Sequence, residues 1–79
     1  MARFTVLLYR EEAGYSAVVP VLNVATQGRT IEEALAMARE VTQLQVNWLA
    51  EHSEPILDEI EPPIVAAVTV DIPVVAEAT

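Results

Sequence analysis

The feature that most constrains this chain is the junction at residues 24–38, VATQGRTIEEALAMA, where a short apolar run passes into a long helical pattern. Gly28 can adopt the positive φ that a tight exit from a strand often requires. Thr30 is expected to cap the helix by accepting a hydrogen bond from the amide of Glu33, whose carboxylate is expected to reach back to the Thr30 amide. This capping box predicts where the helix begins, and its role is architectural.

Two strand-like segments before the junction predict a β-hairpin. Residues 3–10 (RFTVLLYR) are rich in β-branched and aromatic residues, which favours a strand. A polar connection ending in Gly14 leads to residues 15–19 (YSAVV), the expected antiparallel return strand. Pro20 ends that pairing because proline has no amide to donate to a ladder. Residues 24–27 then offer a third short strand.

The longest predicted element is a helix over residues 31–51. Helical spacing places six apolar residues on one side: Ile31, Ala34, Leu35, Ala38, Val41 and Leu49. Met37, Leu44 and Trp48 widen the apolar arc to roughly 200°, beyond the roughly 100° that one core contact needs. One stripe is therefore expected to cover the sheet. The second stripe (Met37, Leu44 and Trp48) is expected to form an oligomer interface, and a place for Trp48 in the core is the alternative.

After the helix, the sequence predicts a connection, one more strand and a tail. Pro55 bars continuation of the helix, and residues 56–63 (ILDEIEPP) indicate an acidic, irregular connection. Residues 64–72 (IVAAVTVDI) carry the strongest strand signal, with the near-continuous apolar character of a strand covered on both faces or lying at an interface. Residues 73–79 are expected to be a loose tail. The expected fold is a single α+β domain over residues 1–79, in the order β-β-β-α-β.

Composition indicates a domain that associates with other proteins. A chain of 79 residues buries only about 60% of the surface of its unfolded state, yet 53% of its residues are hydrophobic. This excess favours a homo-oligomer, a dimer or tetramer, or an obligate complex. Twelve acidic and four basic residues give a net charge of −8, which disfavours direct binding of nucleic acid and would attract a basic protein. Acidity of this kind also simply keeps a small apolar domain soluble.

The sequence predicts no catalytic site, no metal site and no cofactor. It contains no cysteine and one histidine, His52, which is expected to bind carbonyl groups at the end of the helix. Two-metal nuclease chemistry needs several converging acids, and Glu40 on the helix and Asp71 near the end of the last strand are too few. The first residues do not form a signal peptide, and no apolar run approaches the ~20 residues that span a bilayer. A cytoplasmic protein without membrane contact is expected.

Three segments follow one another along the chain in an order that is typical of one protein family. They are the hairpin ending in Val19-Pro20, the segment at residues 27–40 (QGRTIEEALAMARE), and the helix exit Glu54-Pro55-Ile56. Together they resemble the HicB family of antitoxins, including the small stand-alone HicB-like proteins of bacteria and archaea, over nearly the whole chain. The resemblance implies a partial RNase H-like fold, in which a small sheet is backed by one helix, and an oligomeric, non-enzymatic protein.

The resemblance also implies a partner for this chain. That partner would be a small basic HicA-like ribonuclease toxin of double-stranded-RNA-binding-domain fold, whose active histidine the antitoxin covers. Docking is expected at the acidic hairpin turn and in the acidic segment after the helix, that is, at Glu11, Glu12, Asp58, Glu59 and Glu61. The implied function is neutralisation of an mRNA-cleaving toxin by protein–protein occlusion.

The chain departs from the family pattern at two places. Residues 21–24 (VLNV) stand where the family often has a Pro-Gly-Cys-like turn, and the sequence up to Thr79 contains no helix-turn-helix or ribbon-helix-helix module. Operator binding is therefore not expected. Two alternatives stay open: an orphan oligomeric HicB-like module without a toxin partner, and a degraded RNase H-like nuclease.

Overall fold

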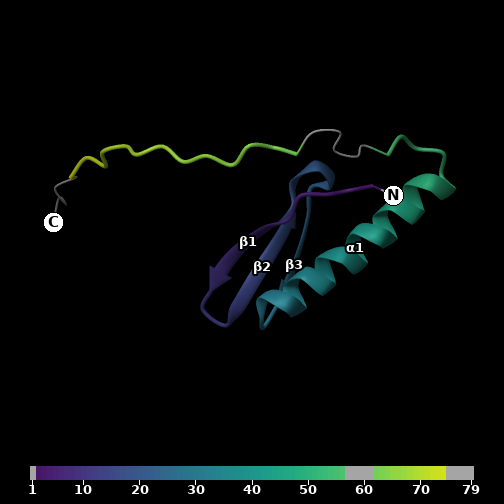
Figure 1. The fold of residues 1–79 in the computed structure, drawn as a ribbon, viewed down its shortest axis with the longest axis horizontal. Helices are drawn as coiled ribbons and strands as arrows, with labels where there is room; N and C mark the ends of the chain where they lie inside the picture. The colour runs from purple at the N-terminus through teal and green to yellow at the C-terminus, as the bar shows by residue number, and fades with distance from the viewer. Residues whose placement is uncertain (1, 57–61, 75–79) are drawn as a thin grey trace, which may run out of the picture.

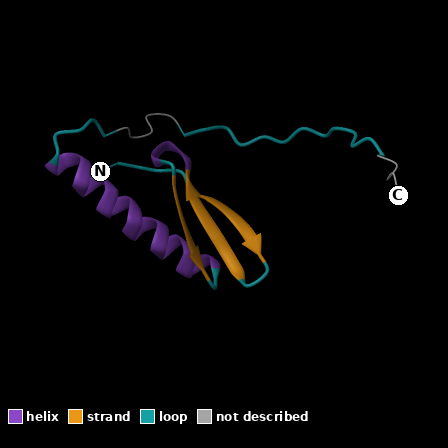
Figure 2. Cartoon of the chain, turned by 180° about the vertical axis from the view of Figure 1, so that it is seen from behind, coloured by secondary structure: helices purple, strands orange, loops and turns teal. Residues whose placement is uncertain are grey.

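The computed structural model describes residues 2–56 and 62–74, which contain a three-stranded sheet and one long helix (Figure 1). The elements are β1 (Leu7–Glu11), β2 (Gly14–Val19), the 3-10 turn η1 (Pro20–Leu22), β3 (Val24–Gly28) and α1 (Ile31–Glu51). The strands form one antiparallel sheet in the order β1-β2-β3. The helix packs against β3 and β2 on one face of this sheet (Figure 2). The predicted α+β class is confirmed.

The strands follow the predicted hairpin, with one difference at the start. Leu7 pairs with Val18 and Glu11 pairs with Gly14, so β1 begins four residues later than the predicted strand at residues 3–10. The physical reason lies in the partner strand, which ends at Val19 because the next residue, Pro20, has no amide to donate. Residues before Leu7 therefore have almost no partner strand to pair with.

Two turns position the strands. Gly14 has φ 154° at the end of the β1–β2 turn, a conformation that glycine adopts at little steric cost. Between η1 and β3, Asn23 takes the left-handed conformation (φ 55°), and its amide donates to the carbonyl of Pro20 over 3.1 Å. Asparagine tolerates this region better than most residues. Asn23 therefore closes the tight connection that lets β3 return beside β2.

The helix begins where the sequence predicts, and its cap differs in one bond. The amide of Glu33 donates to Thr30 Oγ1 over 3.0 Å, as expected of an N-cap. The Glu33 carboxylate, however, accepts from the amide of Arg29 over 3.2 Å and not from the Thr30 amide. The carboxylate thus reaches one residue further back than in the expected capping box. It still satisfies a backbone donor at the positive end of the helix dipole.

Gly28 has a different role from the predicted one. It is not among the residues with positive φ. Instead, a Cβ atom placed on Gly28 would lie 2.8 Å from Ala34 Cα and 2.8 Å from the carbonyl carbon of Glu33. Glycine is required here because the first turn of α1 lies directly on the end of β3.

The core consists of four small buried residues. Ala17 and Val19 lie on β2, and Ala34 and Ala38 lie on the facing side of α1. Six half-buried residues pack around them: Phe4, Val6, Tyr15, Val21, Leu22 and Val24. Because three of the four central side chains are alanines, the helix axis can come close to the sheet. Val19 is the largest fully buried side chain.

The predicted final strand is not formed. Residues 62–74 have no regular secondary structure, and all of them are exposed. We call these residues the C-terminal arm; they run away from the sheet and helix (Figure 1). The chain extends over 57 × 27 × 23 Å with a radius of gyration of 17.1 Å, against about 12 Å expected for a compact chain of this length. Residues 64–72 lack strand structure because no neighbouring strand lies alongside to take their amide and carbonyl groups.

Candidate protein-binding surfaces

The predicted second stripe of the helix lies outside the core. Met37, Leu44 and Trp48 are 41%, 62% and 50% exposed, respectively. The helix surface that meets the sheet is narrower than predicted, because Ile31 and Leu35 are also exposed. One side of a three-stranded sheet cannot cover an apolar arc of this width. The helix therefore presents apolar surface to solvent, as the prediction of an interface requires.

Trp48 is held in place by the only histidine. The rings of Trp48 and His52 stack with centroids 4.0 Å apart and an interplanar angle of 19°. His52 Nδ1 lies 2.8 Å from the carbonyl oxygen of Trp48, and the His52 amide also donates to that oxygen over 3.1 Å. Since a carbonyl only accepts, Nδ1 carries the proton in this contact. The predicted role of His52 at the helix end is confirmed, and the stacking fixes one face of the Trp48 indole.

The acidic hairpin turn lies at the end of the sheet where the helix begins. Glu11 and Glu12 line a shallow hollow with Gly14 and with Gln27 and Gly28 of β3. A second hollow beside it is lined by Gln27 and Gly28 together with Ala13, Arg29 and Glu33. Folding thus brings the hairpin turn and the first turn of α1 to one end of the molecule. We call this region the acidic end, and define it by Glu11, Glu12 and Glu33.

The carboxylates of Glu11 and Glu12 remain available at the acidic end. Both residues are exposed, and within the described part of the chain neither side chain has a hydrogen-bond or ion-pair partner. Arg10 precedes Glu11 on β1, and its side chain contacts Tyr15 on the paired strand. Its guanidinium carbon is 5.8 Å from the centroid of that ring, and its Nη2 donates to the Tyr15 hydroxyl over 3.4 Å. Arg10 therefore makes its side-chain contacts with Tyr15, and Arg29 lies at the same end, lining the second hollow with Ala13 and Glu33.

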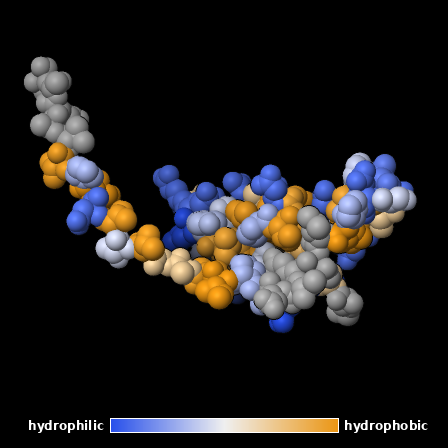
Figure 3. Space-filling view, turned by 90° about the horizontal axis from the view of Figure 1, so that it is seen from above, coloured by the Kyte–Doolittle hydropathy of each residue, from blue (hydrophilic) through white to orange (hydrophobic). Residues whose placement is uncertain are grey.

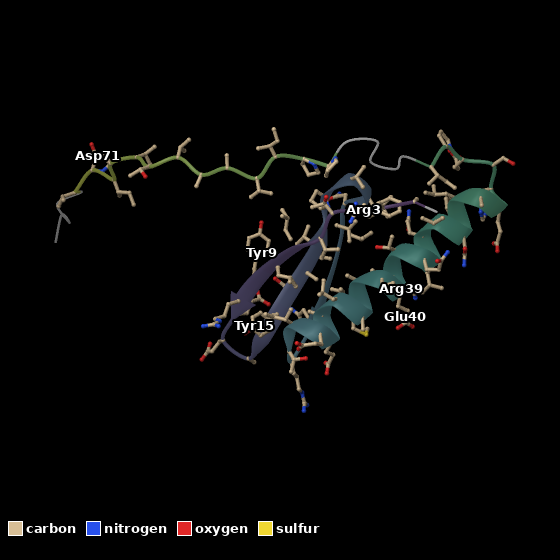
Figure 4. All side chains as sticks on the ribbon, viewed as in Figure 1. Arg3, Tyr9, Tyr15, Arg39, Glu40 and Asp71 are labelled. Carbon is tan, nitrogen blue, oxygen red and sulfur yellow. The ribbon has the colours of Figure 1, made fainter. Side chains whose placement is uncertain are left out.

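The other predicted docking residues, Asp58, Glu59 and Glu61, lie outside the described residues. The two acids considered for metal chemistry are described, and they lie far apart. Glu40 is on α1 and Asp71 is near the end of the C-terminal arm (Figure 4). Among residues 2–56 and 62–74, no three histidine, cysteine or acidic side chains are grouped as they would be around a metal ion.

The sequence does not predict the exposure of two surfaces. The first is the C-terminal arm, whose large apolar side chains are 72–98% exposed (Figure 3). The second is the open face of the sheet, opposite the helix, where the register places Leu7, Tyr9 and Val18. The strand signal at residues 64–72 indicates an apolar, β-prone segment, but it does not indicate that this segment lies apart from the sheet. The open face follows from the two-residue alternation of strands once the register is known.

Comparison with known proteins identifies no relative of this chain. No protein-family model, no curated protein and no solved structure matches it. In the described residues, no helix has both the length and the apolar character needed to cross a membrane.

Proposed function

We propose that this chain is a HicB-like antitoxin module that neutralises a small basic HicA-like ribonuclease by binding over its active site. The observation that carries the proposal is the acidic end, where Glu11 and Glu12 are exposed and have no partner within the described residues. A basic protein could pair with these carboxylates without breaking an existing ion pair, which favours association. The net charge of −8 would also steer a basic partner toward the chain.

The architecture suits binding more than catalysis. The acidic side chains of the described residues are spread over the hairpin turn, the helix and the arm, and they do not converge as metal chemistry requires. Spread carboxylates are suited to a partner that presents several basic groups over a broad surface. In this proposal the module acts in the cytoplasm, binds protein and not RNA directly, and uses no cofactor.

The test is co-expression with a small basic ribonuclease encoded beside this chain. We expect the two proteins to purify together and the chain to relieve the growth arrest caused by the ribonuclease. Binding should weaken steeply as salt rises, because exposed charges are screened over about 8–10 Å at physiological ionic strength. A ribonuclease that stays active and unbound at micromolar concentrations of this chain would contradict the proposal.

A matched pair of charge reversals locates the contact. The double variant Glu11→Lys/Glu12→Lys should lower affinity for the ribonuclease by about tenfold or more, since each lost charge contact is worth roughly 1 kcal/mol. The control Glu40→Lys/Asp71→Lys changes net charge equally at exposed positions outside both expected docking segments and should retain most of the affinity. Equal losses in both variants would show that net charge, and not the acidic end, attracts the partner.

The exposed helix stripe favours a second candidate function, an orphan oligomeric HicB-like module. Met37, Leu44 and Trp48 present apolar surface on a rigid helix, which is typical of a contact between subunits. This candidate predicts a stable homo-oligomer that binds no small basic ribonuclease. The co-expression experiment separates the two functions directly.

A further inference from the structure

We propose that the C-terminal arm is an exchanged β-strand, which pairs with the free edge of β1 in a second copy of this chain. Residues 64–72 of the arm are rich in β-branched residues, as in a β-strand, but they belong to no sheet among the described residues. Its even-numbered positions are all apolar: Ile64, Ala66, Val68, Val70 and Ile72. The odd-numbered positions are mixed, with Val65 and Ala67 apolar and Thr69 and Asp71 polar. In an extended chain these two sets point to opposite faces, so the arm has one apolar face and one more polar face.

The apolar face of the arm is uncovered in its own chain. Ile64, Val68 and Ile72 are 94%, 88% and 86% exposed. Among the described residues, the arm takes part in no sheet. Such a run of apolar side chains in water is costly, at roughly 25 cal/mol per Å² of apolar surface. A partner surface is therefore required, and it must accept an extended backbone.

The outer edge of β1 provides such a surface. The sheet order β1-β2-β3 leaves β1 at one edge, with no strand on its outer side among the described residues. In the register, Leu8 pairs with Ala17, which is buried under the helix, so Leu8 points to the helix side of the sheet. Because α1 packs on β3 and β2, Leu8 remains 36% exposed. A strand added beside β1 would widen the sheet, and its side chains on the helix side would bury Leu8.

The two surfaces fit each other in chemistry. An edge strand offers unpaired amide and carbonyl groups, and the arm offers the same groups in a β-rich, apolar sequence. With its apolar face on the helix side, the arm would cover Leu8, and Asp71 on the other face would remain in water. Tyr9, 53% exposed on the open face, would gain Thr69 and its neighbours as cross-strand contacts.

A second copy is the occupant because the arm extends away from the sheet of its own chain (Figures 1 and 2). Each chain carries one free arm and one free β1 edge. Reciprocal exchange between two copies uses both arms and both edges, and it closes the pair with two-fold symmetry. This inference does not rest on toxin binding. Glu11 is the last residue of β1, but strand pairing uses backbone groups and not the carboxylates of Glu11 and Glu12.

Because the chain contains no cysteine, a single introduced cysteine can be spin-labelled without a competing site. A nitroxide is attached to Val70→Cys in unlabelled protein, which is mixed with ¹⁵N-labelled wild-type chain and allowed to exchange subunits. We expect the amide signals of Leu7–Glu11 in the ¹⁵N copy to broaden, with smaller effects along β3. If β1 signals broaden only when the label and the ¹⁵N lie in the same chain, the arm pairs with its own sheet and the proposal is wrong. Absence of β1 broadening in both samples also contradicts it.

Proline substitution in the arm gives a second test. Val68→Pro/Val70→Pro removes two amide donors from the arm and should weaken dimer formation by about tenfold or more in sedimentation equilibrium. The control Val68→Thr/Val70→Thr keeps β-branched side chains and both amides. It should therefore dimerise more tightly than the proline variant. Helical circular dichroism should be equal in both, because the arm lies outside α1 and the sheet. Unchanged dimerisation in the proline variant would contradict strand exchange.

Discussion

Gly28 lies so close to the first turn of α1 that a Cβ atom on it would stand 2.8 Å from Ala34 Cα. This contact between the end of β3 and the start of the helix sets how near the helix lies to the sheet. It also brings the helix start beside the hairpin turn, because Gly14 faces Gly28 across the end of the sheet and a Cβ on Gly14 would lie 3.1 Å from Arg29 Cα. The acidic end therefore depends on two glycines.

Gly28→Ala should destabilise the fold, although alanine suits a strand better than glycine. The added methyl group meets backbone atoms of the helix, which cannot rotate away, and overpacking of this kind costs about 1–3 kcal/mol. Chemical denaturation should show this loss. Gln27→Ala, at an exposed position on the same strand, should change stability by no more than about 0.5 kcal/mol. Equal effects at both positions would contradict the close-approach interpretation.

Thr30→Ala should lower the free energy of unfolding by about 1 kcal/mol, the usual effect of losing an N-cap hydroxyl. The bond lost is the 3.0 Å contact from the Glu33 amide. Thr30→Ser retains the acceptor and should stay within a few tenths of a kcal/mol of the wild type. Thermal melts followed at a helical circular dichroism band would measure both variants. A serine variant as unstable as the alanine variant would argue against the cap.

Ala38→Leu should disrupt packing between the helix and the sheet. Ala38 is fully buried, and larger side chains inserted into a packed core cost about 1–3 kcal/mol. Ala36→Leu makes the same change at an exposed position of the same helix, where leucine and alanine have similar helix propensities. The difference between the two variants in the free energy of unfolding, measured by urea denaturation, gives the cost of the larger side chain in the core. If both variants unfold at the same urea concentration, the helix does not pack as described.

Trp48→Glu should reduce the sedimenting mass of the protein while leaving its helix content intact. The side chain lies in the exposed stripe with Met37 and Leu44, and a charge at the centre of an apolar contact is costly. Gln43→Glu adds the same charge on another part of the helix surface and is the control. An unchanged mass in Trp48→Glu would show that the stripe is not an interface between subunits.

Local sequence signals predicted the elements but not their contacts. The helix range, the Thr30 cap and the role of His52 follow from residues within four positions of each other, where the backbone geometry of a helix leaves little choice. The sequence predicts a positive φ for Gly28, because it does not reveal how near the helix lies to the end of β3. The sequence also does not predict the bond from the Arg29 amide to Glu33. The Glu33 side chain can reach the amide three or four residues before it, and the path of the chain before the helix decides which of the two it meets.

The hairpin, the third strand, the helix and its ends follow from local sequence, because turns, caps and periodicity act over a few residues. Three features appear only once the chain is folded. They are which apolar residues of the helix meet the sheet, the position of Glu11 and Glu12 at the same end as the helix start, and the position of the arm apart from its own sheet. These outcomes depend on long-range packing, in which a small core of alanines and Val19 covers only part of the apolar surface. The strand signal of residues 64–72 reports local β-propensity, whereas strand formation also requires a free edge alongside the segment.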